Sequence, residues 1–528
     1  MSENKNINSH ILQRTPTIKS KPYRTWRGNE SIPPTGWPTK KREDKVPETK
    51  YSFEMSPDPI HASDIRQIIT SEVVVVGAGL AGLSAAVSAA EAGANTILIE
   101  KTNRYQARGG QNAFIGSRLQ KRLGIEIDKE EVILNLMKHS ANKADQRLIR
   151  MWAEGSHETA DWLMDMTDAA GLEVFIAQYP PPTTFNIADE YYPQYLVSHL
   201  YEDERYVAKC LMDNALRKSA VVYIETRAKQ LLRKEKGRVT GLIAQNSDGY
   251  NIQFNAKKAV VLCTGDYGNN SEMMAKYCPQ SAYLASLIPT STGDGHQMAM
   301  WVGAVMEPAP HAPMIHGPAG PLGNYPFLQV NLKGERFQNE DVPVQSNINA
   351  IERQPGQVAW QVFDSKYPEE IPHMGIGLGK ITKVTEKTRQ HVQKHSITAN
   401  TIEELAEKMM VPVETFKATI ARYNEIARIG KDLDFGKRPD RLTTIEKPPY
   451  YAGQGRYSLE VVNGGLNVNT NLQALDKDWQ VIPGLYLAGN TVGNRFAVDY
   501  PTMCPGISHG MALHHGRVAG LNATNLEP

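Results

Sequence analysis

The distribution of apolar residues along the chain changes at Ser71. Val73–Val76 is an unbroken run of β-branched residues that ends at Gly77, which is typical of a parallel strand buried on both faces. Residues 80–92 are rich in alanine and leucine and end at Gly93, so they predict a helix with a C-terminal glycine cap. Thr96–Ile99 is a second apolar run. The three segments together predict a βαβ unit.

The rest of the chain continues to alternate between the two periods. Helical periodicity spans residues 131–166, 413–429 and 507–519, and Thr401 with Glu404 forms a capping box at the start of another helix. Strand-like runs occupy residues 221–239, 259–263 and 484–487. This alternation predicts an α/β fold built on a parallel sheet. Residues 1–65 are polar and interrupted by prolines, and we interpret them as a surface arm.

Composition adds limits to this picture. With 528 residues, 41% hydrophobic and 22% charged, the chain is expected to form two or three soluble globular domains. Lys plus Arg (58) nearly equals Asp plus Glu (57), so the charge balance does not indicate nucleic acid or an anionic membrane as a partner. We find no membrane-spanning run and no export signal. Four widely spaced cysteines match no haem, zinc or iron–sulfur pattern and favour the reducing cytoplasm.

A glycine motif follows the first predicted strand. In Gly77-Ala78-Gly79-Leu80-Ala81-Gly82, the first glycine allows a tight turn, the second admits a pyrophosphate and the third brings the helix close to the sheet. The helix N-terminus then offers free N–H groups to phosphates. Glu100 follows Gly82 by 18 residues, where a carboxylate can bind ribose hydroxyls. The unit predicts a dinucleotide site, without distinguishing FAD from NAD.

Further motifs make that distinction. In chain order they are Arg108-Gly109-Gly110-Gln111-Asn112-Ala113, Thr264-Gly265, Thr292-Gly293-Asp294-Gly295, Gly334–Glu340, Tyr423-Asn424, Gly464-Gly465-Leu466 and Gly484–Asn490. With them the chain, from about residue 71 to 522, resembles the flavoprotein family of fumarate reductase, succinate dehydrogenase and 3-ketosteroid dehydrogenase. The resemblance implies a Rossmann-like FAD-binding domain split in sequence (66–302 and 442–528), with an inserted α+β capping domain (303–441).

The resemblance also implies which residues hold FAD. They are Gly77, Ala78, Gly79, Ala81, Gly82, Glu100, Lys101, Arg108, Gly109, Gly110, Asn112, Ala228, Thr264, Gly265, Asp294, Gly489, Asn490, Gly506 and Ile507. Asn490 stands where the family usually has glutamate. The helix that starts at Gly506-Ile507 would direct its N–H groups at the flavin pyrimidine edge. Some members attach FAD through a histidine before the Gly-Gly pair, but residues 103–108 contain none, so FAD is expected to bind non-covalently.

The chain departs from fumarate reductases at three positions. Their proton-donating arginine is missing from Asp341–Gln345, their histidine is missing from Val461–Asn463, and Tyr500 replaces a substrate-binding arginine. Fumarate and succinate are therefore not the expected substrates.

Tyr500-Pro501 instead resembles the Tyr-Pro of 3-ketosteroid dehydrogenases and related ene reductases, where the hydroxyl binds or protonates substrate. A phenol can donate a proton to a developing carbanion, although a tyrosine before proline often only packs.

The other catalytic candidates have simpler alternatives. His311 and His316 lie in a proline-rich loop and could bind substrate or be polar surface; Arg336 and Glu340 could act in catalysis or hold the cap together; and His509 could face the flavin. We expect Cys504 to be inert.

The leading hypothesis is hydride transfer between flavin N5 and an activated C=C bond, as in an enone or enoate reductase, with Tyr500 supplying the proton. Three alternatives remain: the reverse, 3-ketosteroid-type desaturation; an electron-transfer flavoprotein without a substrate of its own; and a flavin oxidase. The expected partners are a small alkene or ketone and a separate electron donor or acceptor protein, because no second glycine motif indicates direct NAD(P)H binding.

Overall fold

The computed structural model describes residues 51–107, 110–177, 193–201, 204–374 and 384–525. Residues 51–528 form one compact unit. Across the described part of the chain, no helix combines the length and the apolar character needed to cross a membrane. The arm predicted for residues 1–65 is described only from Tyr51 onward, and there Trp301 Nε1 donates to the carbonyl oxygen of Phe53 at 2.9 Å.

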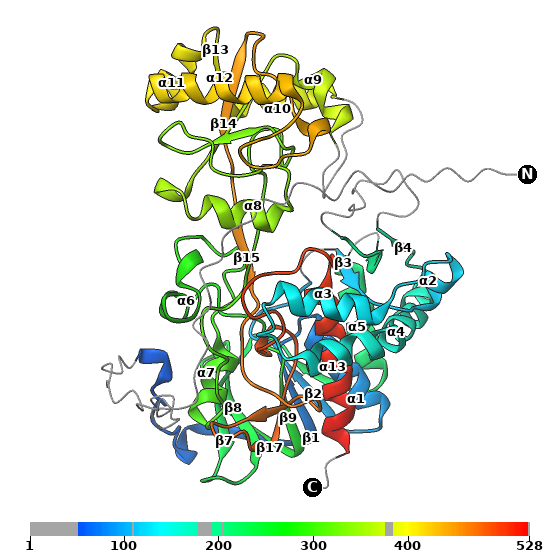
Figure 1. The fold of residues 1–528 in the computed structure, drawn as a ribbon. Coiled ribbons are helices and arrows are strands. Elements are labelled where there is room, and N and C mark those ends of the chain that lie inside the picture. Colours follow the sequence, from blue (N-terminus) through cyan, green and yellow to red (C-terminus); the bar gives the residue numbers. More distant parts are fainter. Residues whose placement is uncertain (1–50, 108–109, 178–192, 202–203, 375–383, 526–528) are drawn as a thin grey trace, which may run out of the picture. The chain divides into compact units, whose positions relative to one another are not determined.

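An eight-stranded sheet forms the base of the fold (Figure 1). Its strands are β1 (Ile65–Val76), β2 (Thr96–Ile99), β6 (Val221–Tyr223), β7 (Thr226–Arg233), β8 (Val239–Asn246), β9 (Asn251–Leu262), β16 (Gln473–Leu475) and β17 (Val481–Leu487). The order β16-β17-β9-β1-β2-β6 places strands from both ends of the sequence side by side, with β7 and β8 joined to β9 as an antiparallel extension. The predicted split of the dinucleotide-binding fold is therefore present.

The helices of this part of the chain are α1 (Leu80–Glu91), α2 (Arg118–Arg122), α3 (Lys129–His139), α4 (Gln146–Ala169), α5 (Glu204–Arg217), α6 (Ser271–Tyr277), α7 (Asp294–Trp301) and α13 (Ile507–Thr524). Among them, α1 and α13 pack against strands of the sheet. Figure 1 shows α13, in red, running beside α1. A Cβ atom on Gly516 would lie 2.1 Å from the carbonyl oxygen of Ala81, so only glycine permits this approach of α13 to α1.

Smaller sheets lie outside the main one. A three-stranded sheet comprises β3 (Gln111–Ala113), β5 (Ser198–Tyr201) and β4 (Val174–Ile176), and β10 (Pro313–His316) forms an antiparallel pair with β15 (Ser458–Val462). A four-stranded sheet has the order β11 (Leu328–Val330), β12 (Trp360–Asp364), β14 (Tyr450–Gln454), β13 (Ile397–Ala399). The helices of this region are α8 (Val344–Ile351), α9 (Tyr367–Glu370), α10 (Glu386–His395), α11 (Ile402–Met409) and α12 (Val413–Ile429).

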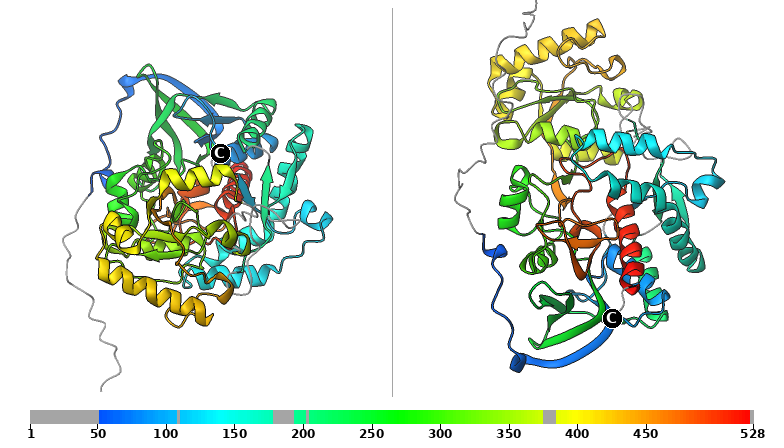
Figure 2. Two further views of the ribbon diagram at one scale, coloured as in Figure 1. Left: turned by 90° about the horizontal axis from the view of Figure 1, so that it is seen from above. Right: turned by 60° about the horizontal axis from the view of Figure 1, so that its bottom comes forward.

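The four-stranded sheet has its own apolar core, shared with α11 and α12 (yellow in Figure 2). Phe416 and Leu405 of these helices are fully buried with Val362 of the sheet. β14 belongs to this sheet although it follows residue 441, where the predicted cap ends, because it pairs with β12 along its full length. The predicted domain boundaries remain predictions.

Two elements differ from the sequence pattern. β1 begins at Ile65, eight residues before the apolar run, because residues 65–71 pair with β9 at a more exposed part of the sheet. The helical stretch 131–166 is interrupted between α3 and α4, where Ala141 and Asn142 adopt positive φ angles of 51° and 57°. Apolar periodicity carries little information about which strands pair or where the backbone turns.

A cluster of charges lies inside the capping region. Arg336 donates from Nε to Glu340 at 2.9 Å and from Nη2 to Asp432 at 2.8 Å, and its side chain is 6% exposed. Lys437 Nζ lies 3.4 Å from Glu340 and donates to the hydroxyl of Tyr423 at 2.7 Å. Burial opposes the ionisation of Asp432, but the hydrogen bonds from Arg336 outweigh it and lower the pKa of Asp432 to about 2. The cluster fixes the end of α12 to the strand-to-helix loop of the cap.

Removing the arginine of this cluster should destabilise the fold. Arg336→Met leaves Glu340 and Asp432 without their shared partner, which typically costs about 3–5 kcal/mol. Because the folded-state pKa of Asp432 is depressed, this stabilisation is present above the unfolded value of about 4 and is lost as pH falls towards 2. Urea unfolding at pH 7 and pH 3 should show the wild-type advantage shrinking at the lower pH.

Arg422→Met is the matched control, because Arg422 makes the same kind of pair with Asp434 on the surface. Its unfolding midpoint should stay close to that of the wild type. Equal losses in the two variants would contradict the role assigned to the buried cluster.

Candidate functional site

The predicted glycine turn has the geometry that a bound pyrophosphate requires. Gly77 has φ +99°, and a Cβ there would lie 2.4 Å from the carbonyl oxygen of Cys263. A Cβ on Gly82 would lie 1.7 Å from the carbonyl oxygen of Gly77. A Cβ on Gly79, in contrast, would meet nothing within 4 Å. The fold itself requires two of the glycines, whereas the third keeps open space at the N-terminus of α1.

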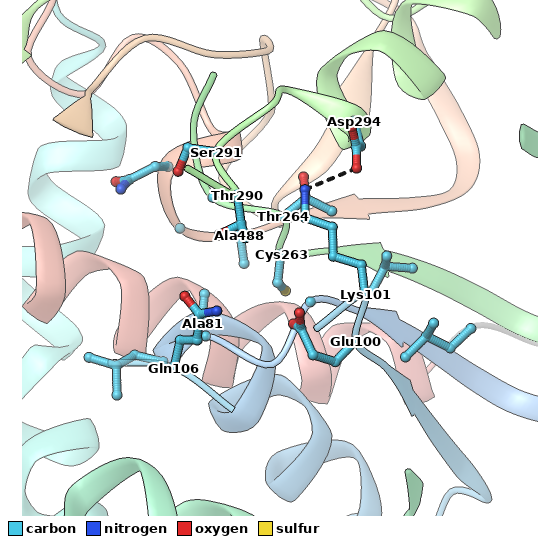
Figure 3. A pocket seen from close by; sticks show the side chains of 18 of the residues that line it. Ala81, Glu100, Lys101, Gln106, Cys263, Thr264, Thr290, Ser291, Asp294 and Ala488 are labelled. Atoms are coloured by element: carbon cyan, nitrogen blue, oxygen red, sulfur yellow. Dashed lines mark hydrogen bonds and ion pairs between the residues drawn. The ribbon is translucent and has the colours of Figure 1, made fainter. Parts of the chain in front are cut away.

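Charged side chains border this turn (Figure 3). Glu100, at the end of β2, accepts from the backbone N–H of Ala78 at 2.7 Å, which ties the carboxylate to the glycine turn. Lys101 Nζ lies 3.1 Å from Asp294 Oδ2, and Arg227 Nη2 lies 2.8 Å from Oδ1 of the same carboxylate. Burial works against ionisation of Asp294, but Arg227 and Lys101 outweigh it and lower the pKa of Asp294.

The structure therefore adds Arg227 to the predicted set. In the sequence, Arg227 could be noticed only because it precedes Ala228 in a predicted strand. No sequence pattern indicated that its side chain would reach Asp294.

A pocket extends from the glycine turn towards the start of α13. It holds about 990 Å³ of space between atoms, part of which is open to solvent. Residues predicted to bind the cofactor make up much of its wall: Gly77, Gly79, Ala81, Glu100, Lys101, Ala228, Thr264, Gly265, Asp294, Gly489 and Asn490. His509 also lines it. The sequence did not single out Gln106, Thr290, Ser291, Met298 and Ala512, which complete the wall with others.

Other predicted cofactor residues are placed around this wall. Ala78, Gly82, Gly110, Asn112, Gly506 and Ile507 do not line the pocket, and Arg108 and Gly109 lie outside the described residues. Gly506 nevertheless touches the neighbouring strand, because a Cβ on it would lie 2.5 Å from the carbonyl group of Gln111. His509 Nδ1 is 3.2 Å from the same carbonyl oxygen. The N-terminus of α13 is thereby joined to β3 beside the pocket.

Tyr500 lies in an apolar cluster next to the start of α13. Its side chain is 2% exposed, and its ring is 5.7 Å from that of Phe496 and 6.0 Å from that of His316. Burial raises the pKa of Tyr500 well above the ordinary value for a phenol, and the backbone N–H of Ser508 offsets only part of this. The hydroxyl is therefore protonated at neutral pH, and it gives up that proton only to a strongly basic group such as a carbanion.

The two candidate histidines occupy different surroundings. His311 is fully buried, stacked on Tyr277 at 5.0 Å, with Nε2 donating to the carbonyl oxygen of Glu307 at 3.1 Å and Nδ1 accepting from the hydroxyl of Tyr267. Both nitrogens are thus occupied within the protein. His316 lies beside Tyr500, and its Nδ1 is 3.6 Å from Glu460. Burial lowers the pKa of each imidazole to about 4, which keeps both neutral.

Arg336 and Glu340 are committed to the charge cluster described above, so the geometry favours their structural alternative over contact with a substrate. Cys504 is fully buried, and burial raises the pKa of its thiol, as expected for an unreactive cysteine. The structure thus groups Tyr500 with His316, places His509 on the pocket wall, and separates Arg336 and Glu340 from both.

Comparison with known proteins gives a family and several relatives. Residues 72–502 match the family described as FAD binding domain. The vinyl phenol reductase of Lactiplantibacillus plantarum is 30% identical over 492 residues, which cover 86% of this chain and 96% of the relative. The fumarate reductase (cytochrome) of Shewanella frigidimarina is 29% identical over 86% of this chain and 77% of its own.

A solved structure agrees with the fold. The 3-ketosteroid-Δ4-(5α)-dehydrogenase of Rhodococcus jostii, solved with 4-androstene-3,17-dione, has a TM-score of 0.73 and 24% sequence identity. The match covers 88% of this chain and 99% of that one. The predicted α/β fold and the resemblance to this flavoprotein family are confirmed.

Gly79 offers a test of the pocket that leaves the fold intact. Gly79→Val should fold, because φ is −80° and the space around Cβ is empty, but the added methyl groups would fill the approach to the phosphates. We expect FAD affinity to fall about 100-fold or more, equivalent to about 2.7 kcal/mol. Flavin fluorescence on titration and thermal unfolding of the apoprotein measure the two properties separately.

Gly77→Ala is the contrasting variant, since its Cβ would meet the Cys263 carbonyl and its φ is +99°. It should lose stability as well as FAD. If Gly79→Val bound FAD as tightly as the wild type, the cofactor would not pass this turn.

Proposed function

The chain belongs to the FAD-binding family that matches residues 72–502, and from that premise we propose that it is an FAD-dependent oxidoreductase that reduces an activated carbon–carbon double bond of a substrate other than fumarate. The observation that carries the proposal is the buried, protonated hydroxyl of Tyr500 beside the N-terminus of α13. The names of the vinyl phenol reductase and the fumarate reductase, which match over 86% of this chain, support reduction of a double bond.

The residues present fit FAD. The empty space at Gly79, the carboxylate of Glu100 and the backbone amides at the start of α1 suit a pyrophosphate and a ribose. The side chains of Lys101 and Asp294, which pair with each other in the pocket lining, would hold the same half of the cofactor. Bound there, the flavin supplies hydride-transfer chemistry, and the protein orients the substrate and handles the proton. Attachment is proposed to be non-covalent, because residues 103–108 contain no histidine.

Reduction of a double bond needs one proton in addition to the hydride. Tyr500 would donate that proton to the carbon next to the activating group, leaving a phenolate that hydrogen bonds to the N–H of Ser508. Solvent would then restore the phenol through groups at the edge of the cluster. His316, whose ring meets Tyr500 edge-on and whose Nδ1 is near Glu460, is the nearest candidate for that step.

The residue types at three positions favour a less acidic substrate than a dicarboxylate. Val461 and Val462, where fumarate reductases have a histidine, are 5% and 0% exposed, and Tyr500 takes the place of an arginine. Apolar side chains cannot neutralise the charge of a second carboxylate. Transferring that carboxylate from water costs free energy when no opposite charge pairs with it. An enone, or an enoate with one activating group, suits these positions better.

The physiological electron source is proposed to be a separate protein, because no second dinucleotide motif follows a strand in the sequence. The cytoplasm is proposed as the compartment, since the four cysteines are free and buried. Desaturation of a ketosteroid-like substrate is the second candidate, favoured by the Tyr500-Pro501 pair and the fold shared with a ketosteroid dehydrogenase.

The proton donor can be tested in a single turnover. Photoreduced enzyme is mixed anaerobically with a panel of enones and enoates, and reoxidation of the flavin is followed by absorbance. Tyr500→Phe should slow reoxidation by about 100- to 10,000-fold, the usual contribution of a positioned general acid. Substrate binding, measured with the oxidised enzyme, should change far less.

Tyr486→Phe is the control, because its hydroxyl donates to the carbonyl oxygen of Asn522 at the far end of α13, at 3.3 Å. If the flavin of Tyr500→Phe were reoxidised at the wild-type rate, Tyr500 would not be the proton donor. Flavin that no alkene reoxidises, but that a partner protein does, would favour an electron carrier over the reductase. Rapid peroxide formation with an amino acid would favour an oxidase.

A further inference from the structure

A fully buried arginine lies behind the pocket wall, between η7 (Gly489–Thr491) and α13. Arg495 is 0% exposed, and its Nε donates to the carbonyl oxygen of Val492 at 2.9 Å. Its Nη2 donates to Oδ1 of Asn490 at 2.8 Å. Its Nη1 is buried and has no hydrogen-bond partner among the described residues. A guanidinium left in this state costs free energy, so its presence calls for a functional reason.

The charge of Arg495 is not paired by contact. Within the described ranges, no carboxylate lies in ion-pair distance of it, and the acids whose charges act on it, Glu307 and Asp266, are engaged elsewhere. Glu307 accepts backbone N–H groups of Gly465 at 3.0 Å and Asn494 at 2.8 Å, and burial raises its pKa to about 7. Burial lowers the pKa of Arg495 to about 10, which still leaves it cationic at neutral pH.

Asn490 connects this cation to the pocket. Its side chain lines the pocket wall, and its Oδ1 accepts from both Arg495 and the hydroxyl of Ser508, the latter at 3.1 Å. Because the guanidinium of Arg495 holds the oxygen, the amide has one orientation, and its Nδ2 is the group left to donate to a ligand. Ser508 Oγ is also 3.2 Å from Asn463 Oδ1, and its single proton serves one of the two amide oxygens at a time.

We propose that Arg495 is a positioning residue for the bound flavin, which fixes Asn490 as a hydrogen-bond donor to the cofactor and supplies a buried positive charge that favours its reduced, anionic form. Uptake of two electrons and one proton by FAD leaves one negative charge on the ring system. A fixed cation joined to the pocket wall through Asn490, in a region of low dielectric, would stabilise that charge without reorganisation. The inference concerns the cofactor and does not depend on the substrate proposed above.

The midpoint potential of the bound FAD tests the charge. Arg495→Gln retains an N–H donor but removes the charge, and the ratio of reduced to oxidised flavin at a fixed potential should fall about tenfold, or about 30 mV for a two-electron couple. Arg495→Lys keeps the charge, and its ratio should stay within about threefold of wild type. A redox titration against a reference dye measures both, and FAD affinity of the oxidised enzyme is measured alongside.

The alkaline titration of the oxidised flavin gives a second readout that turnover does not affect. A nearby cation favours loss of the ring N3 proton, so the spectral pKa of bound FAD should rise in Arg495→Gln and stay near that of wild type in Arg495→Lys. Equal shifts in the Gln and Lys variants would show that Arg495 only packs, and an unchanged potential in the Gln variant would overturn the proposal.

If Arg495→Gln is isolated without flavin, Asn463→Asp is a second variant in which the effect of the charge of Arg495 on the flavin can be measured. Asn463 is fully buried, its Oδ1 is 3.5 Å from Arg495 Nη2, and its Nδ2 has no partner among the described residues. The isosteric carboxylate would pair with the guanidinium and should lower the potential in the same direction. An Asn463→Asp enzyme with the wild-type potential would overturn the proposal. Failure of the double-bond reductase proposal would appear separately, as alkenes that do not reoxidise the flavin.

Discussion

Close backbone contact between the first and last helices is the constraint on which the rest of the structure depends. α1 carries the glycine turn, and α13 carries the groups at the other end of the pocket, yet more than 400 residues separate them. They can pack only because Gly516 lets α13 approach Ala81 and because Gly82 lets α1 lie on the glycine turn. Larger residues at either contact would displace a backbone, and the pocket would lose one of its walls. Packing of this kind leaves little room for adjustment.

The charged groups divide the molecule into parts with different roles. At the glycine turn, Lys101, Arg227 and Asp294 form a partly exposed set that suits a nucleotide. Around the start of α13, polar groups are buried and sparse, so each one acts strongly through a low dielectric. There burial keeps the phenol of Tyr500 protonated, whereas Arg495 keeps its charge although burial opposes it. The cap uses its own buried arginine, Arg336, for stability instead.

Family membership, the cofactor and the class of chemistry could be predicted from the sequence because they depend on local patterns. A strand, a glycine turn and a helix must be adjacent in the chain to form a dinucleotide site, and Thr96–Ile99 and Val413–Ile429 were predicted with the bounds that the structure shows. Arg495 escaped notice because it belongs to no motif, and one of its hydrogen-bond partners, Asn463, lies 32 residues away in the sequence. The partner choices of Arg336 and His311 likewise depend on residues distant in sequence.

The sequence by itself determined that the chain is a flavoprotein of the α/β class, since this follows from residue types at fixed spacing. The tertiary structure decided which polar groups share a site. It joined Lys101 to Asp294, placed Tyr500 against His316 and left one N–H of Arg495 without an acceptor. Those relations depend on distance and burial, because the dielectric around a charge is set by the whole fold and not by neighbours in the chain.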